Sequence, residues 1–174
     1  MKKINLLLIC LFTAITVSSS NLIKGTVITL ADGTEISIEE VRENDTLLTL
    51  DAKNNSILVS KVLKINHTPK SNYKVVVLAD GSELCLTPDH PILSDKGWAA
   101  FDKDATKTRT NYINETVLPY RVDSFIYTID ANFNITVLPV IEIRDSNDEA
   151  ESYSLELDNS NAAFIANGFF TGQE

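Results

Sequence analysis

Three segments of the chain each occur twice, in the same order. Residues 30–35 read Leu-Ala-Asp-Gly-Thr-Glu, and Leu-Ala-Asp-Gly-Ser-Glu follows later in the chain. Residues 45–52 align with residues 123–130, and residues 62–65 align with residues 140–143. A period of about 80 residues is too long for a solenoid repeat, and neither half has enough strands to bury both of its faces. We therefore expect two related β units that share one core, with chance similarity between hairpins as the alternative.

Short apolar segments separated by turns predict an all-β domain. Asp-Gly pairs at residues 32–33 and 80–81 lie between apolar runs and predict β-hairpins, because both central positions of such a turn need a positive φ. The acidic run at residues 145–151 is expected to form a solvated loop. Short helical stretches are expected at residues 38–41 and around residues 98–104.

Composition excludes several function classes. The 174 residues include 24 acids and 15 bases, for a net charge of −9, and 44% are apolar. This is the composition of a folded domain, and its acidity argues against nucleic acid and anionic membranes as partners. Two cysteines and two histidines do not suffice for a typical zinc site, so no metal and no cofactor are expected.

The N-terminus has the layout of a secretory signal peptide. Met1-Lys2-Lys3 is basic, residues 4–17 are mostly apolar, and three serines end the segment at Ser20. We predict a signal peptide at residues 1–20 and a secreted or extracytoplasmic domain at residues 21–174. An uncleaved anchor or a buried helix is the alternative.

The segment around Thr87 and His90 is the strongest candidate for chemistry. Its sequence is Leu-Thr-Pro-Asp-His-Pro, and prolines on both sides of His90 stiffen the turn. Both side chains can therefore point at one peptide group. A neutral imidazole there could protonate a leaving nitrogen, and the threonine hydroxyl or a backbone N–H could stabilise an oxyanion. An ordinary turn is the simpler interpretation of the motif alone.

Several blocks together resemble the Hint domains of Hedgehog proteins, inteins and bacterial intein-like proteins. They are residues 24–33, 38–41, 44–48, 86–91, 96–100, 153–157 and 164–170. The resemblance spans about residues 21–174 and implies a horseshoe of two β subdomains related by a pseudo-two-fold axis. It also implies autoproteolysis or protein splicing by an N–S or N–O acyl shift, with the protein's own chain as substrate. Thr87 and His90 match the pair that polarises the scissile amide in this family.

Other positions depart from the family pattern. Asn21 stands where a Cys or Ser nucleophile is expected, and Ser154 stands where a catalytic Asp is expected. Gly172 and Gln173 stand where inteins have His-Asn. The resemblance therefore predicts a degenerate copy with Thr87 and His90 as a relict pair. The alternatives are a non-catalytic secreted binding or structural module with an unidentified partner, and residual single-turnover cleavage at the N-terminal junction through Ser20.

Overall fold

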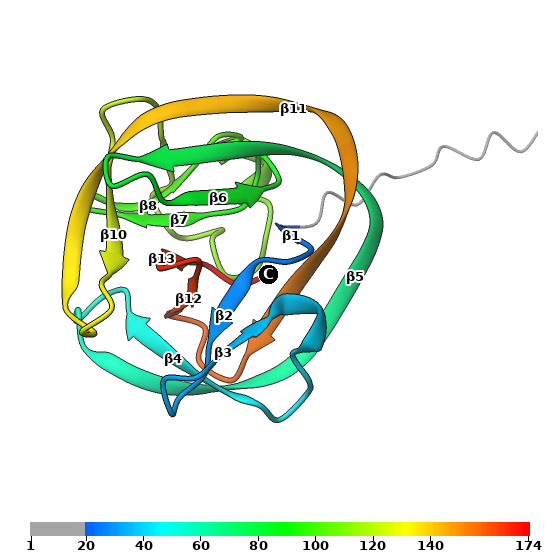
Figure 1. Ribbon diagram of the computed structural model, residues 1–174, viewed down its shortest axis with the longest axis vertical. Coiled ribbons are helices and arrows are strands. Elements are labelled where there is room, and N and C mark those ends of the chain that lie inside the picture. Colours follow the sequence, from blue (N-terminus) through cyan, green and yellow to red (C-terminus); the bar gives the residue numbers. More distant parts are fainter. Residues whose placement is uncertain (1–19) are drawn as a thin grey trace, which may run out of the picture.

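Two long antiparallel strands frame the computed structural model, which describes residues 20–174 (Figure 1). They are β5 (Ile57–Leu78) and β11 (Ile135–Leu157), and they curve around the periphery of the fold. The other strands are β1 (Leu22–Ile23), β2 (Val27–Thr29), β3 (Glu35–Ser37), β4 (Thr46–Asp51), β6 (Glu83–Leu86), β7 (Ile92–Ser94), β8 (Gly97–Ala100), β9 (Leu118–Pro119), β10 (Phe125–Ile129), β12 (Ala162–Ala166) and β13 (Phe169–Thr171).

Helical structure within the described part of the chain is short, as expected. It consists of a 3-10 turn at Ile38–Glu40 and the helix α1 at Lys103–Thr106. The second expected stretch begins later than predicted, because Trp98 belongs to strand β8. No helix among residues 20–174 is long and apolar enough to cross a membrane. The predicted signal peptide lies outside the described residues except for Ser20.

The two halves share a local hydrogen-bond pattern, which confirms the predicted pseudo-two-fold fold. Asn44 has φ 73° and Asp123 has φ 71°, and each lies just before the first strand of a long hairpin. The Asn44 N–H donates to the Val62 carbonyl at 2.8 Å, and the Asp123 N–H donates to the Val140 carbonyl at 2.9 Å. These equivalent contacts begin β4–β5 in one half and β10–β11 in the other.

The sequence alignment of the first repeated strand was wrong by one residue. It paired Leu47 with Phe125, but Leu47 is fully buried whereas Phe125 is 47% exposed. The structural equivalent of Leu47 is Ile126, which is also fully buried. A shift of one position along a strand exchanges its two faces, so burial identifies the correct register.

Both predicted Asp-Gly hairpins form, with a different turn from the one expected. Only the glycine of each pair is left-handed, with φ 84° in β2–β3 and 86° in β5–β6. The aspartate instead accepts hydrogen bonds within the turn. Asp32 Oδ1 accepts the Thr34 N–H at 2.9 Å, and Asp80 Oδ1 accepts the Ser82 N–H at 2.9 Å. The repeated hexapeptide therefore encodes the same turn twice.

The second copy carries an insertion. Leu30 and Leu78 begin equivalent turns 48 positions apart, whereas Asn44 and Asp123 are 79 positions apart. The difference, 79 − 48 = 31 residues, lies between these two landmarks. It is the part of the second copy that contains β7, β8, α1 and β9. These elements form one side of the candidate site.

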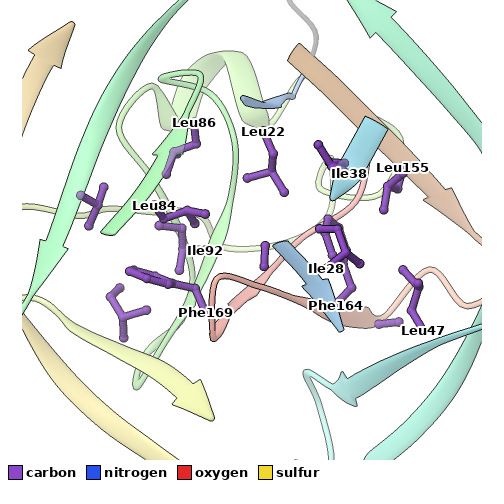
Figure 2. Close-up of a cluster of buried hydrophobic side chains, with 14 of the residues drawn as sticks. Leu22, Ile28, Ile38, Leu47, Leu84, Leu86, Ile92, Leu155, Phe164 and Phe169 are labelled. Atoms are coloured by element: carbon purple, nitrogen blue, oxygen red, sulfur yellow. The ribbon is translucent and has the colours of Figure 1, made fainter. Parts of the chain in front are cut away.

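The hydrophobic core fixes the strand ends that carry the candidate site residues. Leu22 in β1 and Leu86 in β6 are paired in register and both are fully buried. Figure 2 shows them in the same apolar cluster as Phe164 and Phe169. Burying each such side chain contributes roughly 1.5–3 kcal/mol. Asn21 and Thr87, the neighbours of these leucines, are consequently held in place.

Candidate functional site

The pairing of β1 with β6 brings Asn21 and Thr87 together. Asn21 precedes β1 and Thr87 follows β6, and the Thr87 N–H donates to the Asn21 carbonyl at 2.9 Å. The N–H of Asn21 donates in turn to Thr87 Oγ1 at 3.0 Å. The Ser20–Asn21 peptide thus lies directly against the threonine of the Thr-x-x-His turn.

His90 contacts the side chain of Ser20, the first residue of the same peptide. Its Nδ1 is 2.9 Å from the Ser20 hydroxyl oxygen. Ser20, Asn21 and His90 are each at most 1% exposed. The structure therefore brings together Thr87, His90 and Asn21, and it places Ser20, the residue of the alternative cleavage, against the imidazole.

A proline-containing turn, held by contacts from the helix α1, fixes the position of His90. The His90 N–H donates to the Thr87 carbonyl at 3.0 Å, which closes a four-residue turn with Pro88 at its second position. Thr106 at the end of α1 donates its hydroxyl to the Asp89 carbonyl at 2.8 Å. The Asp102 N–H donates to the Pro88 carbonyl at 2.7 Å. Residues of the insertion in the second copy therefore hold the backbone of this turn through hydrogen bonds.

His90 is neutral at neutral pH. Burial and, to a smaller extent, the positive charge of Arg109 lower the pKa of its imidazole from 6.5 to about 3, against the smaller raising effects of a hydrogen bond to Ser20 and the charge of Asp89. Nε2 is buried and has no hydrogen-bond partner among residues 20–174. A neutral imidazole can accept a proton from the Ser20 hydroxyl or donate one to it.

We expect the stability of the domain to decrease between pH 7 and pH 5 because of His90. The unfolded chain takes up a proton near pH 6.5, whereas folded His90 stays neutral until about pH 3. Its contribution is thus complete above pH 6.5 and is lost as the pH falls. The free energy of unfolding should decrease by about 2 kcal/mol between pH 7 and pH 5. Urea titrations at several pH values measure this slope.

The His90→Gln variant is the control for this measurement. Gln does not titrate, so its slope over the same interval should be smaller than that of the natural chain by about 2 kcal/mol. Equal slopes in the two proteins would show that His90 is not a neutral buried group.

The side chain of Asn21 is fixed by hydroxyl groups from the two long strands. Its Nδ2 donates to Thr68 Oγ1 on β5 at 3.0 Å and to Ser152 Oγ on β11 at 2.8 Å. Ser71 contacts the same Ser152 hydroxyl at 2.7 Å. Thr68, Ser71 and Ser152 belong to no motif, so the sequence analysis missed them. The pairing of Thr68 with Ser152 in the strand register is what brings their hydroxyl groups together.

A buried ion pair lies behind Thr87. The Thr87 hydroxyl donates to Asp89 Oδ1 at 2.7 Å, and the Arg109 guanidinium forms an ion pair with Asp89 Oδ2. The side chains of Arg109 and Asp89 are only 9% and 4% exposed. Asp89 could have been found as a member of the Thr-Pro-Asp-His sequence. Arg109 follows α1 in the insertion, and no signal in a single sequence links it to the site.

The C-terminal residues are packed into the fold. Gln173 Oε1 accepts the Leu157 N–H at 2.6 Å, and Gln173 Nε2 donates to the Asn159 carbonyl at 2.6 Å. A Cβ atom at Gly172 would lie 2.6 Å from Pro91 Cγ and would overlap the Tyr112 hydroxyl. The side chain of Gln173 therefore fixes the C-terminal segment, and no space for a side chain remains at Gly172.

Ser154, the position of the expected Asp, lies two residues from Ser152 along β11. It is 2% exposed, and its hydroxyl donates to the Glu174 carboxylate. Asn66 on β5 donates to the same carboxylate oxygen. In Figure 1 the C-terminus accordingly ends near β1.

A duplicated β fold whose first strand delivers a peptide to a Thr-x-x-His turn is the architecture of intein-like domains. A family model described as Vint, a Hint domain, matches residues 22–132, which is more than half of the chain. The chain therefore belongs to the Hint-domain family.

Solved inteins and intein-like domains share this fold. The DnaB intein of Synechocystis sp. PCC 6803 is 16% identical, with a TM-score of 0.73 over 90% of this chain and 99% of the intein. A bacterial intein-like domain from Clostridium thermocellum is 16% identical, with a TM-score of 0.66 over 90% of this chain and 100% of that domain. The DnaX mini-intein of Spirulina platensis is 18% identical, with a TM-score of 0.65, over 88% and 99% of the two chains. No curated protein matches the sequence.

Proposed function

We propose that this protein is a secreted Hint domain of the self-processing type that has lost the acyl shift at the Ser20–Asn21 peptide. The observation that carries the proposal is the position and bonding of Asn21, which holds the place of the nucleophile and donates to Thr68 and Ser152. In this proposal the domain acts as a binding or structural module built on a self-processing scaffold. The layout of residues 1–20 supports its export.

The chemistry of the amide side chain is the reason for the proposed loss. The first step in the family needs a thiol or hydroxyl at residue 21 that attacks the carbonyl carbon of residue 20. The amide nitrogen of Asn21 is a poor nucleophile, because its lone pair is delocalised. Both of its hydrogens are also directed at hydroxyl oxygens. Thr87 and His90 can hold the peptide, but no group at residue 21 accepts the acyl chain.

The contacts of the C-terminal residues extend the proposal to later steps. In inteins an Asn side chain cyclises to release the C-terminal junction. Gln173 at that position uses both ends of its side chain to hold backbone groups of residues 157 and 159. Gly172 offers no imidazole, and the space beside it is filled by Tyr112.

The natural sequence is therefore expected not to release a passenger. We would fuse a passenger protein directly before Asn21, incubate the fusion with a strong thiol and follow its intact mass. The mass should stay unchanged over days. A thiol-dependent decrease to the mass of residues 21–174 would disprove the proposal.

A second candidate function is residual cleavage before Ser20, and the 2.9 Å contact between Ser20 Oγ and His90 Nδ1 favours it. In this reaction Ser20 Oγ attacks the carbonyl carbon of residue 19, and His90 transfers the hydroxyl proton to the leaving nitrogen of Ser20. The amide becomes an ester with a free amine, and water then hydrolyses the ester.

The mass of the product distinguishes this reaction from signal-peptide removal. Self-cleavage of the full chain, synthesised without signal peptidase, would leave Ser20 as the first residue, and the Ser20→Ala variant would stay intact. The signal peptidase cleavage predicted from the sequence would instead leave Asn21 first. An intact full chain in the absence of signal peptidase would disprove the second candidate.

A further inference from the structure

We propose that Asp89 and Arg109 are positioning residues, which fix Thr87 as the hydrogen-bond acceptor of the Ser20–Asn21 peptide N–H. This inference rests on the proposed function in one respect, since it takes that peptide as the one the site is built to hold. It concerns two residues that lie outside the Thr and His of the motif, one of them in the 31-residue insertion of the second copy.

The direction of each hydrogen bond follows from the groups involved. A backbone N–H only donates, so Thr87 Oγ1 is the acceptor in its 3.0 Å contact with the N–H of Asn21. The single hydroxyl proton of Thr87 must then point elsewhere. It points at Asp89 Oδ1, at 2.7 Å. An ionised carboxylate has no proton to donate, so Thr87 is the donor in this contact.

Arg109 supplies the charge that makes this orientation stable. Its guanidinium contacts Oδ2 of Asp89, while Oδ1 serves Thr87. The two oxygens of one carboxylate therefore have separate roles. A buried carboxylate without a counter-charge is costly, and Arg109 is always protonated. The ion pair thus keeps Asp89 as a hydrogen-bond acceptor for Thr87. Water has little access to this contact, because Thr87 is only 6% exposed.

The charges that face His90 fit the same arrangement. Arg109 lowers the pKa of His90 and Asp89 raises it, so the two charges of the pair act on the imidazole in opposite directions. His90 remains neutral beside a charged pair, and its Nδ1 stays available to Ser20.

The arrangement changes the role expected for Thr87. From the motif alone, its hydroxyl is a candidate donor that could stabilise an oxyanion. The proton of Thr87 is directed at Asp89, so the hydroxyl faces the peptide as an acceptor. An acceptor beside the peptide nitrogen stabilises the positive charge that develops when a leaving nitrogen is protonated. Thr87 therefore acts on the nitrogen of the junction rather than on its carbonyl oxygen.

Hydrogen exchange at the Asn21 amide tests the proposal on the natural chain. In Asp89→Asn the side-chain NH₂ can donate to Thr87 Oγ1 and compete with the Asn21 N–H. Exchange of the Asn21 amide should become at least about tenfold faster. Thr87→Val should give the same acceleration, and Thr87→Ser should restore protection to that of the natural chain. Amides of β12 report global opening and should not change by the same factor.

A double-mutant cycle separates positioning from general loosening of the site. In the Thr87→Val background, Asp89→Asn should add no further acceleration, because the two residues act in series. An equal acceleration in both backgrounds would overturn the proposal. So would unchanged exchange of Asn21 in Asp89→Asn.

Arg109 provides the second route if Asp89→Asn does not fold. Arg109→Lys keeps the charge and should retain the protection of the Asn21 amide, whereas Arg109→Gln should reduce it about tenfold. Equal protection in the two variants would overturn the proposal.

None of these measurements requires cleavage. A fusion that cleaved without modification would disprove the proposed function and leave this inference standing, and the reverse also holds.

Discussion

Replacing Asn21 by Cys is expected to restore thiol-dependent release of a passenger fused directly before residue 21. A thiol at this position is intrinsically nucleophilic. It would lie beside the hydroxyls of Thr68 and Ser152, which can donate to a thiolate as they accept from the natural amide. The fusion should change from no detectable release to release within hours, measured by intact mass with and without thiol.

Two variants test whether the restored release depends on the thiol and on His90. Adding His90→Ala to the Asn21→Cys fusion should reduce the release rate at least about 100-fold, because general acid–base catalysis contributes this much. The Asn21→Ala fusion matches the loss of the amide but carries no nucleophile, and it should release nothing. If the Cys and Ala fusions behave alike, the scaffold around Thr87 no longer supports an acyl shift.

Introducing the family's histidine at Gly172 is expected to damage the fold rather than restore activity. Even a methyl group there would lie 2.6 Å from Pro91 Cγ and would overlap the Tyr112 hydroxyl. Tyr112 is 1% exposed and packs edge-on against Trp98, so it cannot simply move into solvent. Overpacking of this kind costs about 3 kcal/mol, which lowers the melting temperature by roughly 6–12 °C in a domain of this size.

A smaller pair of changes at the same place serves as the control. Gly172→Ala should destabilise the protein less than Gly172→His. Adding Tyr112→Phe to Gly172→Ala should recover part of the stability lost in Gly172→Ala, because it removes the overlapping oxygen. Thermal unfolding of the natural protein, Gly172→Ala, Tyr112→Phe and the double variant measures this coupling. An unchanged melting temperature in Gly172→His would show that the space is not filled as described.

The parts of the fold that depend on local chemistry are predictable from the sequence. The Asp-Gly hairpins and the repeated order of elements depend on turn residues and on alternating apolar positions, and both were found. Residues 66–72 and 145–151 behave differently. No residue in either segment is buried, so neither shows an alternating pattern. The acidic run at residues 145–151 was therefore expected to form a solvated loop, whereas the structure places it within β11.

Some residues of the candidate site can likewise be predicted from the sequence, and others cannot. Thr87 and His90 are three positions apart in a segment that Pro88 and Pro91 stiffen, so their shared turn can be predicted from the sequence. Arg109 reaches the site only because the insertion folds back on the turn through Thr106. Contacts of this kind depend on tertiary packing, which a single sequence does not encode in any local pattern.

The position of β1 sets an order of events during synthesis. This strand has two residues, and it pairs with β6 on one side and with β11 on the other, where Leu22 faces Tyr153. The N-terminal residues leave the ribosome first, yet Ser152, which holds the Asn21 side chain, is made 131 residues later. Long-range strand pairing is also slow compared with hairpin formation. The peptide at Ser20–Asn21 is therefore not in its folded surroundings until β11 has been translated, so chemistry that needs this site cannot begin earlier in synthesis.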